Sequence, residues 1–313
     1  MNADLSVMAF VTEIIPNDVL HYPALGTIQY HPSLLPLHRG SSAINWAIIN
    51  GDRETGLTIF WPDQGIDTGA ILLQKSCPIG PDDTVGSIYF NHLFPMGVDA
   101  LAESVQLVAE GRAPRIGQDH ALSTYEPPCG EGHARIRWYK PAEVIHRLIR
   151  GCNPAPGAVA TYNDSEFKIF DCRLTGSQEA GMPGRILKVK DDYFDVRLNG
   201  GVLRVSRVQP KGGKKVAAGE WAKEVGLAVG AAGRSGPSGA HCGHWPPSRP
   251  PKGGKKMSAG EWAKEAGVGG WDAVPGGSTA TAQTFPRPGT SRRGPLEWAQ
   301  GTRRCRCSWS SIL

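Results

Sequence analysis

The chain has 313 residues, enough for two domains of ordinary size, each with its own core. Its composition, 40% hydrophobic and 20% charged, is typical of soluble globular proteins, and no apolar run approaches the ~20 residues that a membrane helix needs. The first residues do not resemble a secretory signal, so we expect a cytoplasmic location and no membrane partner. The seven cysteines form no CxxC pair, which argues against a zinc site or a disulfide framework.

The net charge of +5 is unevenly distributed. Residues 1–129 carry 5 Lys/Arg against 14 Asp/Glu, a balance of −9. Residues 130–225 carry 17 against 11, or +6, and residues 226–313 carry 12 against 4, or +8. The basic sections could attract a polyanion, although basic side chains that solvate the surface are the simpler interpretation.

The first section alternates short β-like runs with helical patterns, which is typical of an α/β domain with a largely parallel, Rossmann-like sheet. Gly51 is placed to end one helix, and Pro95 should kink or divide a longer one that Asp82 or Asp83 begins. In chain order, the expected strands are 5–11, 24–30, 57–61 and 71–73, and the expected helices are a turn at 16–18, then 43–49 and a long helix from 82.

After a Pro/Gly/polar linker, the second section combines one helix with five short strands and favours a small antiparallel, OB-like barrel. The expected helix is 140–150, and the expected strands are 157–162, 167–173, 184–189, 195–198 and 202–208. The Gly-, Ser- and Pro-rich tail should be disordered. It contains a near-copy, at 251–267, of the segment 210–226. We expect domains at 1–115 and 135–225, a linker at 116–134 and the tail at 226–313.

A histidine and an aspartate stand out as candidate catalytic residues. His31 leaves the end of an expected strand and enters a loop between two prolines, and Asp67 lies in a tight polar turn between two further strands. Loops at the carboxyl ends of strands are where open α/β sheets bind ligands. An imidazole can donate a hydrogen bond to a tetrahedral oxyanion, and a carboxylate can hold a nucleophile. Taken alone, such a pair is more often a capped loop and a turn.

The string His31-Pro-Ser-Leu-Leu-Pro36, followed by Arg39-Gly40 and by Asp67-Thr-Gly69, is similar to the motifs of the folate-dependent formyltransferases. The resemblance covers about residues 3–225. It is strongest to the hydrolase domain of 10-formyltetrahydrofolate dehydrogenase, with methionyl-tRNA formyltransferase as the other close branch. That family normally opens with several strand–helix units, so the resemblance also implies a missing amino-terminal portion and an exposed sheet edge.

The resemblance implies a catalytic His31 and Asp67 and 10-formyltetrahydrofolate as the formyl donor, with no metal and no nicotinamide site in this chain. Many members carry an asparagine two residues before the histidine, where this chain has Gln29. Its amide sits on an arm longer by one methylene, and a displacement of ~1 Å can cost roughly 100-fold in rate. Folate contacts are implied for Glu13, Ile14, Ile15, Ser33, Leu34, Leu35 and Asp67.

Three functions follow as alternatives. The first is hydrolysis of 10-formyltetrahydrofolate to tetrahydrofolate and formate, or formyl transfer to an amine. The second is formylation of an aminoacyl-tRNA, for which the basic charge of residues 130–225 would suit tRNA phosphates. The third is an inactive remnant that binds folate. His38, beside Arg39, and the pair His241 and His244 show no set of further metal ligands and are expected on the solvated surface. The oligomeric state is left open.

Overall fold

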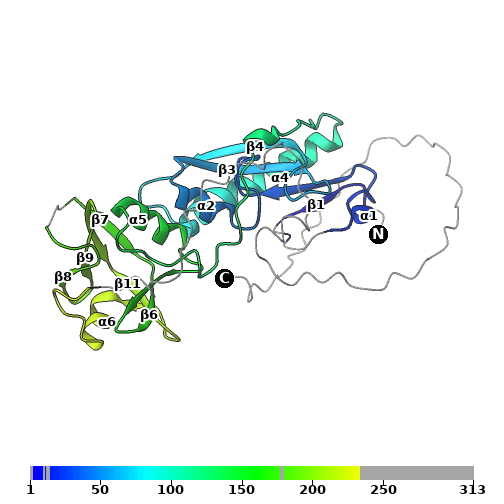
Figure 1. Cartoon of the computed structure of the whole chain (residues 1–313). Coiled ribbons are helices and arrows are strands. Elements are labelled where there is room, and N and C mark those ends of the chain that lie inside the picture. The colour runs from blue at the N-terminus through cyan, green and yellow to red at the C-terminus, as the bar shows by residue number, and fades with distance from the viewer. Residues whose placement is uncertain (1–2, 10, 12–14, 177–179, 233–313) are drawn as a thin grey trace, which may run out of the picture. The chain divides into compact units, whose positions relative to one another are not determined.

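A computed structural model of the chain describes residues 3–9, 11, 15–176 and 180–232 (Figure 1). The tail from 233 onward, including the second copy of the repeated segment, lies outside these residues, as do Glu13 and Ile14. In the described part of the chain, no helix combines the length and the apolar character required to cross a membrane.

The first domain is built on a four-stranded mixed sheet in the order β1-β2-β3-β4. Its strands are β1 (Ser6–Met8), β2 (Thr27–His31), β3 (Glu54–Trp61) and β4 (Ala70–Pro78). Only β1 and β2 are parallel, so the expectation of a largely parallel sheet was wrong for the described residues. The short turn at 62–69 forces β3 and β4 to be antiparallel. The long 32–53 connection permits either direction for β3, so alternation of strands and helices does not fix it.

The helices of this domain are α1 (Asn17–Leu20), α2 (Ala43–Asn50), α3 (Val85–Ile88), the π-helical turn η1 (Tyr89–Leu93) and α4 (Phe94–Ala109). Gly51 ends α2 in the left-handed conformation, as predicted. The N-cap of α3 is Thr84, which forms a capping box with Ser87, whereas Asp83 accepts a hydrogen bond from the Ser87 hydroxyl. Pro95 lies in the first turn of α4, where the π turn ends, so the long helix is divided as expected.

Strand β2 has two different faces because successive side chains alternate. Tyr30 lies against α4, where a Cβ added to Gly97 would come 2.8 Å from the tyrosine ring. Gln29 and His31 occupy the other face of the strand. The packing of α4 therefore fixes the strand whose opposite face carries the histidine.

The segment expected to be a linker is bonded to the first sheet. Ile71 and Ile116 exchange two main-chain hydrogen bonds of 2.8 and 2.9 Å, and Arg39 forms an isolated bridge with Tyr125. The Trp46 indole donates to the carbonyl of Pro127 at 2.7 Å. One short 3-10 helix, η2 (His120–Leu122), interrupts this segment. Residues 116–127 thus run across the first domain before the chain enters the second.

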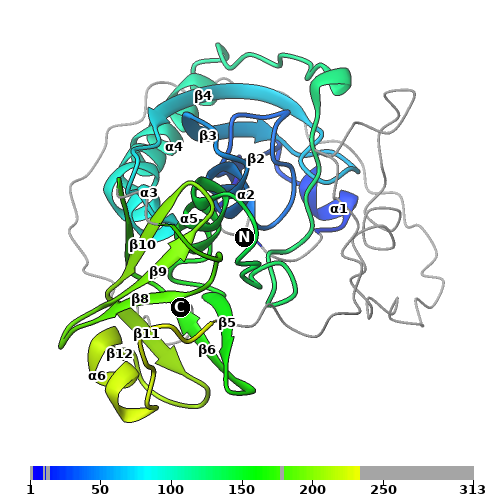
Figure 2. The same ribbon diagram turned by 60° about the vertical axis from the view of Figure 1, so that its left-hand side comes forward.

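The second domain forms two four-stranded antiparallel sheets, β7-β10-β9-β8 and β12-β11-β6-β5, and no closed barrel among the described residues (Figure 2). The expected runs 167–173 and 202–208 each divide into two strands, because the chain turns a corner at 170–171 and again at 206. The two corners are bonded together: the amide of Ser206 donates to the Asp171 carbonyl at 2.9 Å. The elements are α5 (Ala142–Gly151), β5 (Ala158–Tyr162), β6 (Ser165–Ile169), β7 (Cys172–Thr175), β8 (Ile186–Val189), β9 (Phe194–Leu198), β10 (Gly201–Val205), β11 (Arg207–Pro210), β12 (Val216–Ala217) and α6 (Ala218–Glu224).

The first copy of the repeated segment, 210–226, closes this core. It supplies β12 and α6, whose Trp221 packs against the rings of Phe167 and Phe194. Gly219 approaches the main chain so closely that an added Cβ would lie 2.0 Å from the Lys190 carbonyl oxygen. This copy is therefore part of the second domain.

Helix α5 connects the two domains through contacts with α2 and with the turn before α3. The Asn45 amide donates to the carbonyl of Gly151 at 2.8 Å. Arg150 donates to the carbonyl of Asp83 at 2.6 Å. Gly151 has no side chain to separate α5 from α2, so the helices approach closely at this point.

Candidate functional site

His31 is the last residue of β2 and is only 5% exposed. Its Nε2 lies 2.9 Å from the main-chain oxygen of His38. A carbonyl oxygen can only accept, so Nε2 carries a proton and donates it. The other ring nitrogen, Nδ1, lies 3.5 Å from Oδ2 of Asp67. The structure thus brings the two predicted catalytic residues together and leaves Nδ1 as the nitrogen that faces the carboxylate.

Asp67 is positioned by the turn between β3 and β4. Its φ of +53° is uncommon for a non-glycine residue, although aspartate tolerates it better than most. Its Oδ2 accepts a hydrogen bond of 2.8 Å from the amide of Gly40. Asp63 stabilises the same turn by accepting from the Gly65 amide and the Thr68 hydroxyl. At Gly69 an added Cβ would lie 1.8 Å from the Trp61 carbonyl, so this turn requires glycine.

The loop after His31 is held by internal hydrogen bonds. The hydroxyl of Ser33 donates to the Leu37 carbonyl at 2.6 Å, and Thr58 donates to the Ser33 carbonyl at 2.6 Å. Ser33 and Leu35 are buried, and Leu34 is half-buried beside Gly56. These contacts shape the loop, and the folate contacts of the three residues stay a prediction.

Gln29 lies two residues before His31 on the same strand face and is half-buried. It pairs with Phe60 of β3 in the sheet register. This placement is compatible with an amide directed to the same side as the imidazole, and the role of Gln29 stays a prediction. Ile15 is half-buried, whereas Glu13 and Ile14 lie outside the described residues.

Arg39 belongs to the motif, but the sequence did not reveal its structural role, and its side chain is only 1% exposed. Its guanidinium donates to the Tyr125 hydroxyl, to Gln118 Oε1 and to His120 Nδ1. The Gln118 amide in turn donates to the main-chain carbonyls of Asp67 and Gly69, at 2.9 and 2.7 Å. Arg39 therefore supports the aspartate turn through Gln118. Gln118 lies in a polar stretch that gave no local signal of this contact.

His38 was expected on the surface, and it is instead buried between two carboxylates. Its Nε2 lies 2.6 Å from Asp52 Oδ2 and its Nδ1 lies 3.2 Å from Glu126 Oε1. Burial alone would lower the pKa of His38, but the hydrogen bonds with both carboxylates outweigh burial and raise the pKa to about 9. At neutral pH the ring is an imidazolium that donates from both nitrogens.

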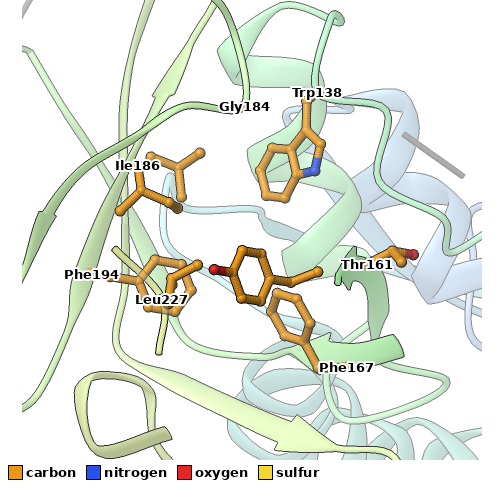
Figure 3. Close-up of a pocket in the computed structure, with 9 residues that line it drawn as sticks. Trp138, Thr161, Phe167, Gly184, Ile186, Phe194 and Leu227 are labelled. Carbon is orange, nitrogen blue, oxygen red and sulfur yellow. The ribbon is translucent and has the colours of Figure 1, made fainter. Parts of the chain in front are cut away.

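The second domain contains a small apolar cavity that is not a candidate ligand site (Figure 3). Its volume is ≈ 10 Å³, which leaves room for about one water molecule. It is lined by Trp138, Thr161, Tyr162, Phe167, Gly184, Ile186, Phe194, Val196 and Leu227. Across the described ranges, no group of three or more His, Cys, Asp or Glu residues is arranged to hold a metal ion.

Comparison with known families identifies the class of protein. Residues 1–97 match the model described as "Formyl transferase", and residues 131–226 match "Formyl transferase, C-terminal domain". The chain therefore belongs to the formyl transferase family.

Relatives from two branches of this family are similar to the chain. Methionyl-tRNA formyltransferase from Moorella thermoacetica is 39% identical over 214 residues, which cover 68% of each chain. Cytosolic 10-formyltetrahydrofolate dehydrogenase from Xenopus laevis is 42% identical over 238 residues, or 73% of this chain and 26% of the relative. The human mitochondrial 10-formyltetrahydrofolate dehydrogenase is 45% identical over 190 residues, or 61% of this chain and 20% of the relative. The chain spans about a quarter of the length of the dehydrogenases that it matches.

Two solved structures share the fold. The crystal structure of HypX from Aquifex aeolicus in complex with tetrahydrofolic acid has a TM-score of 0.61 at 21% identity, over 72% of this chain and 39% of HypX. The sugar 3N-formyl transferase WlaRD, solved in the presence of dTDP and 5-N-formyl-THF, has a TM-score of 0.52 at 23% identity, over 64% of this chain and 71% of WlaRD.

Proposed function

We propose that the chain acts on the formyl group of 10-formyltetrahydrofolate, by hydrolysis to tetrahydrofolate and formate or by transfer to an amine. The observation that carries this proposal is the pairing of His31 Nδ1 with Asp67 Oδ2 at 3.5 Å, at the end of a buried strand. Membership of the formyl transferase family, together with the similarity to the dehydrogenases named for this folate, supports the choice of substrate.

In the proposed reaction, water or an amine attacks the formyl carbon and forms a tetrahedral oxyanion. His31, carrying a proton on each ring nitrogen, donates a hydrogen bond from Nδ1 to the developing oxyanion while Nε2 stays bonded to the His38 carbonyl, and the Gln29 amide donates a second hydrogen bond to the oxyanion. The Asp67 carboxylate accepts a hydrogen bond from the nucleophile and orients it. Collapse of the intermediate breaks the bond between the formyl carbon and N10 of the folate, and N10 receives the proton that the nucleophile loses.

A product assay tests this proposal and separates the two acceptors. The full chain is incubated with 10-formyltetrahydrofolate, and formate and tetrahydrofolate are both quantified. Equal amounts of the two products indicate hydrolysis. Tetrahydrofolate without formate, in the presence of an amine acceptor, indicates transfer. Saturable folate binding with neither product would contradict the proposed reaction and would support the folate-binding remnant.

Methionyl-tRNA formylation is the second candidate, because the matched region covers 68% of the Moorella methionyl-tRNA formyltransferase. The +6 balance of residues 130–225 would suit tRNA phosphates. A gel shift with initiator tRNA at several salt concentrations tests this candidate. Binding that weakens steeply with salt would favour it, and no binding at low salt would remove it.

A cytoplasmic location stays a prediction, since the similar dehydrogenases include one named cytosolic and one named mitochondrial. Localisation of the tagged full chain by microscopy tests it.

A further inference from the structure

His38 connects three segments of the first domain at a point next to the proposed catalytic histidine. The residue belongs to the loop after β2. Its ring forms ion pairs with Asp52, which follows α2, and with Glu126, which lies on the segment 118–126. These two carboxylates are the charged groups that interact with the ring among the described residues. Glu126 is 5% exposed, so its charge is matched inside the protein.

The main-chain amide and carbonyl of His38 each form a hydrogen bond. Its amide donates to the Thr124 hydroxyl at 2.7 Å, and its carbonyl accepts the proton of His31 Nε2 at 2.9 Å. Its φ of +55° is a left-handed conformation that is uncommon for non-glycine residues, although less so for histidine, and here the surroundings constrain it. The ring contacts on one side and the Thr124 contact on the other supply that constraint.

The position of the His38 carbonyl determines the tautomer and the orientation of the His31 ring. While this carbonyl accepts from Nε2, the neutral His31 ring has its proton on Nε2 and a lone pair on Nδ1, and a second proton would enter at Nδ1 beside Asp67. If the loop relaxed, Nε2 would lose its acceptor and the ring could rotate or take the other tautomer. The comparable effect of an ordered partner on a histidine tautomer is well known at metal and acid–base sites.

We propose that His38 is a positioning residue for the proposed formyl reaction: its imidazolium, clamped between Asp52 and Glu126, holds its own main-chain carbonyl against His31 Nε2 and so sets the tautomer and orientation of His31. This inference rests on the proposed function for its kinetic consequence, but its structural consequence can be measured without turnover. Loss of the His38 proton would leave one of its two nitrogens without a hydrogen to donate to a carboxylate.

The test compares the full chain with His38→Gln, which is neutral and of similar size, and with His21→Gln, a matched change at an exposed histidine of the same domain. Nitrogen NMR of ¹⁵N-histidine-labelled protein reports which His31 nitrogen is protonated, and His31→Ala assigns the signals. We expect wild type and His21→Gln to show protonated Nε2, and folded His38→Gln to show a mixture of tautomers. We also expect kcat for formate release to fall about 10–100-fold in His38→Gln, with KM changed less than about threefold.

A folded His38→Gln protein with an unchanged His31 spectrum and unchanged kcat would overturn the proposal. If that variant does not fold, Glu126→Gln provides the test instead. In this variant Asp52 still hydrogen-bonds with the His38 ring, but one of the two carboxylates that raise the pKa of His38 is gone. In wild type, kcat should fall as pH rises through about 9, and in Glu126→Gln this fall should occur at lower pH. Superimposed profiles would overturn the proposal. If wild type releases neither formate nor tetrahydrofolate, with or without an amine acceptor, the proposed function fails while the His31 spectrum still tests the role of His38.

Discussion

At the scale of residues, the proposed catalytic pair, His31 and Asp67, is held by the main chain of one short loop. The His38 carbonyl accepts from His31 Nε2, and the Gly40 amide donates to Asp67 Oδ2. Residues 38–40 therefore align both members of the pair at once. The side chains of His38 and Arg39 in this loop are themselves buried and hydrogen-bonded, which helps to hold the loop in place.

Asp67→Asn tests the charge of the carboxylate at nearly constant shape. An asparagine can still accept from the Gly40 amide and tolerates the left-handed φ, so we expect the free energy of unfolding to change by less than about 1 kcal/mol. The rate should fall about 100- to 1,000-fold, because the negative charge beside Nδ1 is lost. Urea unfolding and kcat measured on the same preparation check both expectations. A rate within about threefold of wild type would contradict the role of this carboxylate.

The pH dependence of stability tests the His38 charge. The pKa of His38 is raised from 6.5 to about 9 in the folded protein, so its contribution is complete below pH 6.5 and is lost as pH rises through 9. We expect His38→Gln to be less stable than wild type by on the order of 2–3 kcal/mol at pH 6, with the difference shrinking toward pH 9.5. Urea unfolding at several pH values measures this. A difference that is constant with pH would mean that the ring is not charged in the folded state.

At the scale of elements, the segment 118–126 joins the two halves of the site. The Gln118 amide donates a hydrogen bond to the main-chain carbonyl of Asp67, and the Glu126 carboxylate accepts one from the ring of His38, on the loop after β2. The same segment forms a main-chain bridge with Arg39 through Tyr125. A stretch with the composition of a linker thus supports the proposed catalytic pair.

Close packing of α2 and α5 at Gly151 gives a prediction at this scale. A Cβ at Gly151 would lie 2.5 Å from Ile49 Cγ1 and 2.9 Å from the Asn45 carbonyl oxygen, so the helices must separate in Gly151→Ala. We expect a loss of about 1–3 kcal/mol in stability. Gly132→Ala is the control, because an added Cβ there meets nothing within 4 Å. Thermal unfolding of both variants checks this, and an equal Tm for the two would contradict the packing.

Local patterns predicted some elements well. The end of α2 at Gly51 and the division of the long helix near Pro95 follow from the chemistry of those two residues and were confirmed. Strand direction in the first sheet was not predictable, because it depends on how the chain returns through the 32–53 connection. The runs at 167–173 and 202–208 looked continuous, since the corners that divide them are made by hydrogen bonds between distant residues.

The candidate site was predictable only where a motif marked it. His31 and Asp67 were recognised from the resemblance, and the structure brings them together. His38 and Gln118 were not recognised, and Arg39 was marked only as part of the motif. Their burial depends on contacts between residues that are 14 to 88 positions apart. The local composition of residues 118–126 does not predict that this segment contacts the loop at 38–40, which is distant in sequence.

At the scale of the whole molecule, the first domain is acidic and carries the proposed catalytic pair. The second domain is basic and contacts the first domain through α5. The family assignment covers both domains. The proposed formyl chemistry uses residues of the first domain alone. In the proposal that the acceptor is a tRNA, the basic second domain would supply the affinity, and the salt dependence of tRNA binding tests this.

The measurement that tests the central claim most directly is formate release from 10-formyltetrahydrofolate by the wild-type chain, His31→Ala and His21→Ala. We expect release by wild type, the same rate in the exposed-histidine control, and loss of release in His31→Ala without loss of folding or folate binding. Turnover of His31→Ala at the wild-type rate would contradict the claim that this imidazole, paired with Asp67, acts on the formyl group.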